Sequence, residues 1–276
     1  MTRWPMAVAV LLLALVLVAV LSGAAWLWFM QERLLFAPEV LPPQTRLAQE
    51  ADISEHTLDV PGARLSALHL QQADAKGVVF FLHGNAGNLQ TWFTNAAFYR
   101  QAGFDLYMLD YRGFGKSTGQ IQSEAQLRAD VRAAWNQVAP RYAGKKIVVY
   151  GRSLGSGLAA GLAAELAAQG APQQPDLTVL VSAYSSMLAL ADQHFAWVPH
   201  FLLRYPLRTD QLIGSIRQPV LLFHGDRDAL IPPRHSERLV QLAPHATLLL
   251  VAGAAHNDVH EFPAYRDAFR AALAAL

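Results

Sequence analysis

The chain has 276 residues and a formal net charge of +1, and 53% of its residues are hydrophobic against 16% charged. This composition excludes a disordered or low-complexity protein, which could not bury enough apolar surface to offset its chain entropy. The lack of any cysteine excludes disulfide frameworks, zinc ribbons and cysteine nucleophiles, and with no run of basic residues we expect no nucleic-acid partner.

The first predicted element is an apolar helix over residues 6–30, which follows a tail of residues 1–5. Such a helix measures about 37 Å, more than the roughly 30 Å hydrocarbon core of a bilayer. A cleaved signal peptide that ends near Ser22 and Gly23 is the alternative. The apolar run nevertheless continues through an aromatic cluster at residues 26–30, which is typical of a membrane interface. We therefore expect a single-pass anchor, or an uncleaved signal sequence, in a lipid bilayer.

The positive charges on the two sides of this segment are equal in number, so they give little indication of its orientation. Arg3 and the amino group precede it, and Arg33 and Arg46 follow it. The short tail resembles that of an uncleaved signal sequence, so we expect the rest of the chain outside the cytoplasm, in the periplasm if the host is a bacterium. The opposite orientation is the alternative.

After a proline-containing connector over residues 31–51, one domain is expected over residues 52–276. Two alternating segments around Pro61-Gly62 predict an antiparallel hairpin, and the uninterrupted apolar runs that follow predict parallel strands buried on both faces. The expected strands are 56–60, 64–71, 77–82, 104–109, 146–150, 177–181, 219–223 and 246–251.

Helical patterns occupy the gaps between these strands, at residues 126–138, 154–169, 236–242 and 263–276. This alternation predicts an α/β fold with about eight mostly parallel strands and helices on both faces. Residues 187–217 interrupt the pattern and are rich in aromatic residues, so we expect a short cap there.

Two segments match the pattern Gly-x-Ser-x-Gly. The segment at 115–119 follows its strand at a distance, and we interpret it as a strand-exit loop. It also resembles the end of a phosphate-binding loop, but Asp110 stands where that motif needs glycine. The segment at 151–155 comes directly after a predicted strand and leads into a small-residue helix. This context is typical of a nucleophile elbow that exposes Ser153, and a structural Gly-Ser turn is the alternative.

A serine nucleophile needs a base, and the base needs an acid to orient it. Asp226 and Asp228 both follow the strand at 219–223; we choose Asp228 as the acid and expect Asp226 to cap the turn or pair with the arginine beside it. His256 follows the last strand and is the expected base, whereas His260 is expected at the surface. These two histidines have no third metal ligand evident in the sequence, so we expect no metal.

Two N–H donors are needed to stabilise the oxyanion that forms during acyl transfer. We expect them from Leu154, directly after the nucleophile, and from Asn85 in the loop after an early strand. His83 in that loop is expected to be structural. Four aromatic residues are candidates for an apolar substrate pocket together with those of the cap, the alternative being that most are core: Trp92, Phe93, Phe114 and Tyr184.

These motifs resemble the α/β-hydrolase superfamily over residues 58–276. Within it, residues 83–88, 110–117 and 151–155 are similar to membrane-anchored serine hydrolases of the bud-emergence (Bem) type, and residues 31–38 also fit that group. The resemblance implies a catalytic triad of Ser153, Asp228 and His256. Some relatives remove palmitoyl groups from proteins and attach to membranes through lipidated cysteines, which this chain lacks.

The sequence therefore predicts a membrane-anchored serine hydrolase that cleaves an ester or thioester of a small or acyl-chain substrate and needs no cofactor. A serine peptidase is the nearest alternative, because amide cleavage uses the same triad. A catalytically silent scaffold used for binding is the alternative from a different class, and the presence of all three triad candidates argues against it.

Overall fold

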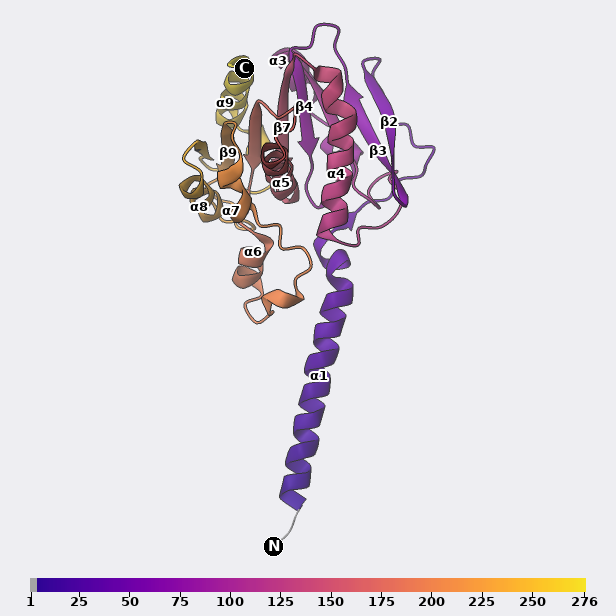
Figure 1. The fold of residues 1–276 in the computed structure, drawn as a ribbon, viewed down its shortest axis with the longest axis vertical. Coiled ribbons are helices and arrows are strands. Elements are labelled where there is room, and N and C mark those ends of the chain that lie inside the picture. Colours follow the sequence, from indigo (N-terminus) through magenta and orange to yellow (C-terminus); the bar gives the residue numbers. More distant parts are fainter. Residues whose placement is uncertain (1–3) are drawn as a thin grey trace.

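The computed structural model describes residues 4–276. A 32-residue helix, α1 (Trp4–Leu35), projects from an α/β domain (Figure 1). It is long and apolar enough to cross a membrane, a test that a signal sequence near the N-terminus also passes. The helix continues beyond the predicted segment at 6–30 because Gln31 and Glu32 favour helix and no proline occurs between residue 30 and Pro38.

The domain is built on an eight-stranded sheet with the order β10-β9-β8-β7-β4-β6-β3-β2. The strands from β10 to β6 run parallel, and the β2–β3 hairpin adds two antiparallel strands at one edge. Each predicted strand is present with small shifts at its ends: β2 (Ile53–Val60), β3 (Ala63–Leu70), β4 (Gly77–Leu82), β6 (Phe104–Leu109), β7 (Lys146–Arg152), β8 (Leu177–Val181), β9 (Val220–Gly225) and β10 (Ala246–Val251).

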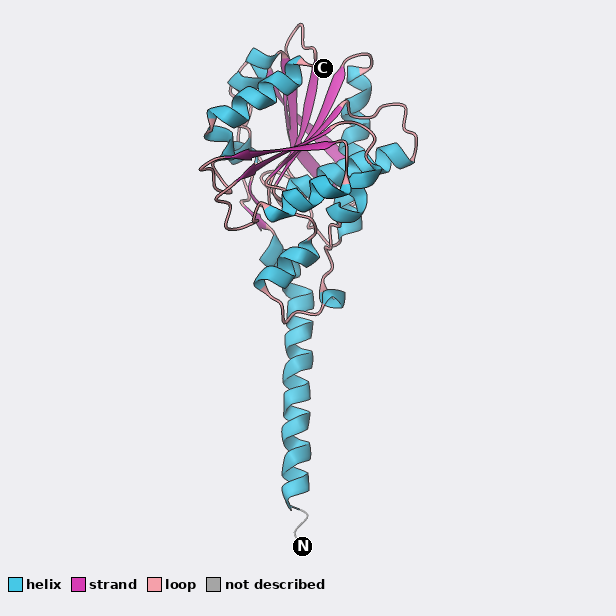
Figure 2. Cartoon of the chain, turned by 90° about the vertical axis from the view of Figure 1, so that its left-hand side faces the viewer, coloured by secondary structure: helices cyan, strands magenta, loops and turns pink. Residues whose placement is uncertain are grey.

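Helices cover both faces of the twisted sheet (Figure 2). Alternate residues of the central strands face opposite sides: Val78 and Phe80 belong to one apolar cluster, Val79 and Phe81 to the other. The first cluster includes residues of α4 (Glu124–Val138), α5 (Leu154–Ala168) and α8 (Arg234–Leu242), and the second includes residues of α3 (Ala96–Ala102) and α9 (Pro263–Ala274). Burial on both faces is why these strands read as continuous apolar runs. The sequence pattern did not indicate α3.

Residues 187–217, where we expected a cap, form short elements: α6 (Met187–His194), α7 (Thr209–Leu212) and 3₁₀ turns at His200–Leu202 and Ile213–Ser215. Both views place the first part of this segment beside the end of α1 that meets the domain (Figures 1 and 2). The buried Gln31 joins the two, because its side-chain amide donates to Leu202 O at 2.6 Å and accepts from the N–H of Arg204 at 2.8 Å.

A second contact ties α1 to the sheet. Directly after the helix, the two-residue strand β1 (Ala37–Pro38) pairs in parallel with β5 (Ala86–Gly87), which lies in the loop after β4. A short helix, α2 (Leu89–Trp92), follows β5 and is capped by the Asn88 side chain. The end of α1 therefore lies against the loop for which we predicted an oxyanion donor.

Candidate active site

Ser153 lies in the turn between β7 and α5, with a φ of 51° and a ψ of −121°. A positive φ is uncommon for a residue with a side chain and persists only where the surrounding structure enforces it. Here the close approach of neighbouring backbone does so: a Cβ on Gly151 would lie 2.1 Å from Gly155 O, and a Cβ on Gly155 would lie 2.0 Å from Leu82 O. Glycine is therefore required on both sides of Ser153, and the turn leaves the serine partly exposed.

Three side chains form a hydrogen-bonded chain at this turn. The Nε2 atom of His256 lies 3.0 Å from Oγ of Ser153, and its Nδ1 atom lies 2.7 Å from Oδ2 of Asp228. Because the carboxylate only accepts, we assign the ring proton to Nδ1, which leaves Nε2 to accept from the serine hydroxyl. The three residues follow β7, β9 and β10, whose carboxyl ends meet at one edge of the sheet.

The carboxylate of Asp228 is fully buried and densely hydrogen-bonded. Its Oδ1 atom accepts from the N–H groups of Leu230 at 3.0 Å and Ile231 at 2.8 Å, and its Oδ2 atom also lies 3.3 Å from Nε2 of His224. Burial alone raises the pKa of this carboxyl, but the hydrogen bonds from His224, His256 and Ile231 outweigh burial and hold the pKa well below its usual range. Asp228 therefore stays ionised and can balance a positive charge on His256.

Asp226 and His260, the alternatives to Asp228 and His256 in the sequence, lie outside this chain of hydrogen bonds. Asp226 is exposed, and its Oδ1 atom accepts from the N–H of Gly253 at 2.7 Å, so it links the two strand-exit loops instead of pairing with Arg227. His260, expected at the surface, is half-buried, because its Nδ1 atom packs 3.2 Å from Nη1 of Arg152. Burial, and then the charge of Arg152, lowers the pKa of His260.

The serine of the other Gly-x-Ser-x-Gly segment holds a loop in place. Ser117 is buried, donates to Asp110 O at 2.8 Å and accepts from the N–H of Ser66 at 2.8 Å. His83 is fully buried as well, and its Nδ1 atom lies 2.7 Å from Gly84 O. The contacts of both residues agree with the structural roles expected from the sequence.

The predicted oxyanion donors lie beside Ser153. A Cβ on Gly84 would lie only 3.7 Å from Cβ of Ser153, which places the neighbouring Asn85 next to the turn. Leu154 is the first residue of α5, so its N–H has no acceptor within the helix. Within residues 4–276, neither this N–H nor that of Asn85 donates a hydrogen bond, so both can serve a ligand oxygen.

The end of α1 holds the Asn85 loop in position. The side chain of Asn85 donates from Nδ2 to Leu35 O at 2.8 Å, and the carbonyl of Asn85 accepts from the N–H of Ala37 at 2.8 Å. The side-chain amide is thus used in this contact, and the backbone N–H is the group left for a ligand.

Sequence reasoning missed two residues that support the site. The guanidinium of Arg152 donates to His256 O at 3.1 Å and Asn257 O at 2.7 Å, and so holds the loop that carries the imidazole. His224 is fully buried beneath Asp228, with its Nδ1 atom 2.7 Å from Oγ of Ser236. Position is the only sequence signal for these residues: Arg152 directly precedes the nucleophile, and His224 lies near the end of β9.

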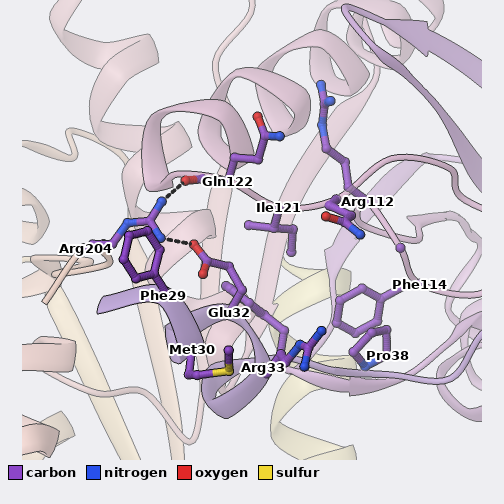
Figure 3. Close-up of a pocket in the computed structure, with 13 residues that line it drawn as sticks. Phe29, Met30, Glu32, Arg33, Pro38, Arg112, Phe114, Ile121, Gln122 and Arg204 are labelled. Atoms are coloured by element: carbon purple, nitrogen blue, oxygen red, sulfur yellow. Dashed lines mark hydrogen bonds and ion pairs between the residues drawn. The ribbon is translucent and has the colours of Figure 1, made fainter. Parts of the chain in front are cut away.

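The four aromatic candidates for a substrate pocket do not line one pocket. Phe114 and Tyr184 are buried in the cluster on one face of the sheet, whereas Trp92 and Phe93 pack against the cluster on the other. Phe114 lines a cavity of about 450 Å³ next to α1. In Figure 3, Arg204 points toward Glu32 and Gln122 at one side of this cavity. Trp92 lines a different cavity of about 360 Å³, and the triad residues line neither.

Two family models match the domain. One, described as serine aminopeptidase S33, matches residues 73–205, and the other, described as alpha/beta hydrolase fold, matches residues 181–263.

Curated proteins with similar sequences include two without a described function. The uncharacterised protein YfhR of Escherichia coli (strain K12) is 31% identical over 191 residues, which cover 67% of this chain and 64% of YfhR. The match thus spans somewhat less than two thirds of that relative. An uncharacterised protein of Mycobacterium tuberculosis is 31% identical over 251 residues, which cover 87% of this chain and 85% of the relative.

Solved structures share the fold at low sequence identity. The Pyrococcus furiosus esterase Pf2001 has a TM-score of 0.65 at 18% identity, with 87% of this chain and 97% of that chain covered. The thioesterase domain from the curacin biosynthetic pathway has a TM-score of 0.58 at 14% identity, with 80% and 99% covered. The predicted fold, with its mostly parallel eight-stranded sheet, is confirmed.

Proposed function

This chain belongs to the α/β-hydrolase superfamily, and from the geometry of its site we propose that it is a serine hydrolase that cleaves esters or thioesters of small or acyl-chain substrates. The observation that carries the proposal is the hydrogen-bonded chain from Ser153 through His256 to Asp228 beside two unoccupied N–H donors. A site that only binds ligands needs no such arrangement of nucleophile, base and acid.

In this mechanism, Oγ of Ser153 attacks the substrate carbonyl while Nε2 of His256 takes its proton. Asp228 remains ionised, orients the imidazole and balances its charge, and the N–H groups of Asn85 and Leu154 bind the oxyanion. The imidazolium then gives its proton to the leaving alcohol or thiol. Water, deprotonated by His256, attacks the acyl-enzyme and releases the acid.

The test of the nucleophile compares the two Gly-x-Ser-x-Gly serines. Replacement Ser153→Ala should abolish labelling by a fluorophosphonate probe and lower kcat for p-nitrophenyl esters by about 10⁴-fold or more, as losses of a triad member do. The matched variant Ser117→Ala should keep the label. A labelled Ser153→Ala protein would overturn the proposal, and a wild-type protein that neither labels nor turns over esters would indicate a silent scaffold.

The test of the acid compares the two neighbouring aspartates. Replacement Asp228→Asn should lower kcat by about 10⁴-fold, because an amide favours the wrong tautomer of His256. Replacement Asp226→Asn should cost mainly stability, about 1 kcal/mol for a turn contact, measured by urea unfolding. The reverse pattern would contradict the assignment.

A serine aminopeptidase is the second candidate, favoured by the family model that matches residues 73–205. The same triad can attack an amide, but release of an amine requires stronger protonation of the leaving group. Aminoacyl p-nitroanilides distinguish the two activities. Turnover of these substrates at rates above the esters, lost in Ser153→Ala, would favour the peptidase.

We also propose that α1 anchors the protein in a membrane with the domain outside the cytoplasm. The length and apolar surface of α1 support an anchor, and the motifs at 83–88 and 151–155 support a place among the Bem-type hydrolases. Alkaline phosphatase or green fluorescent protein fused after Leu276 tests the orientation in a bacterial host. Phosphatase activity without fluorescence is expected, and a fluorescent, phosphatase-silent fusion would contradict it.

A further inference from the structure

An apolar groove of about 430 Å³ runs between the last turns of α1 and the first part of the cap. One wall is formed by α1, chiefly Trp26, Leu27 and Leu34, and the opposite wall by α6 and the residues after it, including Leu190 and Val198. Its volume lies within the range of roughly 300–1,000 Å³ that is usual for ligand pockets. The groove is thus large enough to hold a ligand.

Three polar side chains in the groove wall, those of Gln31, Tyr205 and His194, are already paired within the protein. The amide of Gln31 bonds to Leu202 and Arg204, and the hydroxyl of Tyr205 donates to Glu32 at 2.7 Å. The Nε2 atom of His194 lies 3.1 Å from Leu230 O. A ligand therefore meets mainly apolar surface here, which fits a hydrocarbon chain and not a polar molecule.

Two walls of the groove connect to the two sides of the candidate active site. On the α1 side, Leu35 accepts a hydrogen bond from the side chain of Asn85, the predicted oxyanion residue. On the cap side, His194 contacts Leu230, whose N–H donates to the Asp228 carboxylate.

A third connection runs along the chain itself. Met187, which lines the groove, begins α6 shortly after β8, and the N–H of Ser153 donates to Val181 O at the end of that strand. The walls of the groove therefore contact the segments that carry the oxyanion loop, the nucleophile turn and the acid loop, although the triad residues themselves do not line it.

The groove lies between the last turns of α1 and the cap. Figure 1 shows that this end of α1 meets the domain, which is the membrane surface if α1 spans the bilayer. The cap beside it exposes large aromatic side chains, with Trp197 77% and Phe201 80% exposed. Aromatic residues at this level are typical of proteins that contact the interface of a bilayer.

We propose that this groove receives the acyl chain of a bilayer lipid, so that the ester carbonyl of the lipid reaches Ser153. The proposal rests on the serine hydrolase and the anchor proposed above, and it names the substrate class of that site. A lipid acyl chain can enter from the bilayer beside α1 without crossing water.

The first test fills the groove. Wild-type kcat/KM for p-nitrophenyl esters should rise from acetyl to dodecanoyl, by up to about fourfold for each CH₂ that is buried. Ala191 lines the groove, so Ala191→Trp should lower the dodecanoyl-to-acetyl ratio of kcat/KM at least tenfold, with Ala191→Leu as a milder filling variant. The exposed Ala196 lies in the same cap outside the groove wall, and Ala196→Trp should leave the ratio unchanged.

The outcomes separate this proposal from the one on which it rests. If wild-type protein neither binds the fluorophosphonate nor turns over the acetyl ester, the serine hydrolase itself fails. If acetyl ester is hydrolysed and the ratio is the same in Ala191→Trp as in wild type, the groove assignment is wrong. Fluorophosphonate labelling of the filled variants shows that they are folded.

The second test identifies the source of the chain. The Ser153→Ala protein in phosphatidylcholine nanodiscs that contain a diazirine-bearing phosphatidylcholine is irradiated, and crosslinks are located by mass spectrometry. Val198 is only 7% exposed, so crosslinks at Val198 and Leu190 are expected from a chain inside the groove. Adding Ala191→Trp should remove them and keep crosslinks on the lipid-facing part of α1.

Either of two results would overturn the bilayer lipid as occupant. Crosslinks at Val198 that persist in the filled variant would mean that lipid reaches this residue outside the groove. Their absence from both proteins, with the dependence on ester chain length intact, would indicate an acyl chain from another source, such as a lipidated protein.

Discussion

The side chain of Arg152 connects the nucleophile turn to the loop that carries His256. Its guanidinium is buried, bonds to the carbonyls of His256 and Asn257, and lies 5.4 Å from the centre of the Trp92 ring. Because a base must stay within hydrogen-bond reach of its nucleophile, a shift of this loop of about 1 Å can cost 10²-fold in rate. We therefore regard Arg152 as a positioning residue.

Replacement Arg152→Gln should lower kcat for a short ester by about 10²-fold and change KM little, because it displaces His256 and leaves the substrate surface intact. Arg152→Lys should retain part of the rate, since an ammonium can still donate to a carbonyl. The exposed Arg227 provides the control Arg227→Gln, with no expected effect. A rise in KM at unchanged kcat would assign Arg152 to substrate binding instead.

At the level of elements, Gln31 joins α1 to the cap. The residue is 2% exposed, and its amide satisfies both a carbonyl and an N–H of the segment at 202–204. Removal of one partner from a buried hydrogen bond leaves the other group unsatisfied, at a cost of about 1–3 kcal/mol. Gln31 is thus one of the side chains that dock the cap on α1, together with Glu32, which bonds to Arg204 and Tyr205.

Replacement Gln31→Ala should therefore lower the thermal unfolding temperature of the protein in detergent and speed proteolysis within the cap. The exposed Arg33, two residues along the same helix, is the matched control. Arg33→Ala should change stability by no more than about 0.5 kcal/mol, as is usual for surface positions. Equal proteolysis of the two variants would show that the cap is held by other contacts.

The sequence predicted those features that follow from local pattern. Uninterrupted apolar runs identified the buried strands, and the positions of Ser153, Asp228 and His256 at strand ends placed them at one edge of a parallel sheet. The turn at Ser153 could also be expected, because close backbone approach at Gly151 and Gly155 leaves room only for glycine.

Features that depend on contacts between distant segments could not be predicted in this way. The bond from Asn85 to Leu35 spans 50 residues and that from Arg152 to His256 spans 104, and neither has a periodic signature. The pocket candidates remain a prediction for a different reason: aromatic residues serve cores as well as pockets, and Phe114 and Tyr184 are buried in the core.

At the scale of the whole molecule, buried neutral histidines make stability depend on pH. The Nε2 atom of His69 lies 2.7 Å from the hydroxyl of Tyr142, which donates to Asp105 at 2.6 Å. Its Nδ1 atom has no partner within residues 4–276, so a second ring proton would be buried without an acceptor. Burial, then the charges of His56 and Arg141, lowers the pKa of His69 from 6.5 to about 4.

Because the unfolded chain binds this proton near its ordinary pKa of 6.5 and the folded chain does not, the stabilisation is complete above that pH. It should be lost as the pH falls toward 4, by about 1.4 kcal/mol per pH unit. Urea unfolding of the detergent-solubilised protein at pH 7.5 and pH 5 measures the loss. His69→Gln should reduce the difference between the two pH values, and an unchanged difference would assign the effect elsewhere.

The connection between α1 and the domain is one residue long. Only the buried Phe36 separates the helix from β1, which pairs at once with the loop that carries Asn85. A spanning helix longer than the hydrocarbon layer tilts to fit it. If α1 spans the bilayer as proposed, the domain would turn with the helix, so the thickness of the bilayer would set the tilt of the domain over the lipid headgroups. The access of the candidate active site to the lipids of the bilayer would then differ between thin and thick membranes.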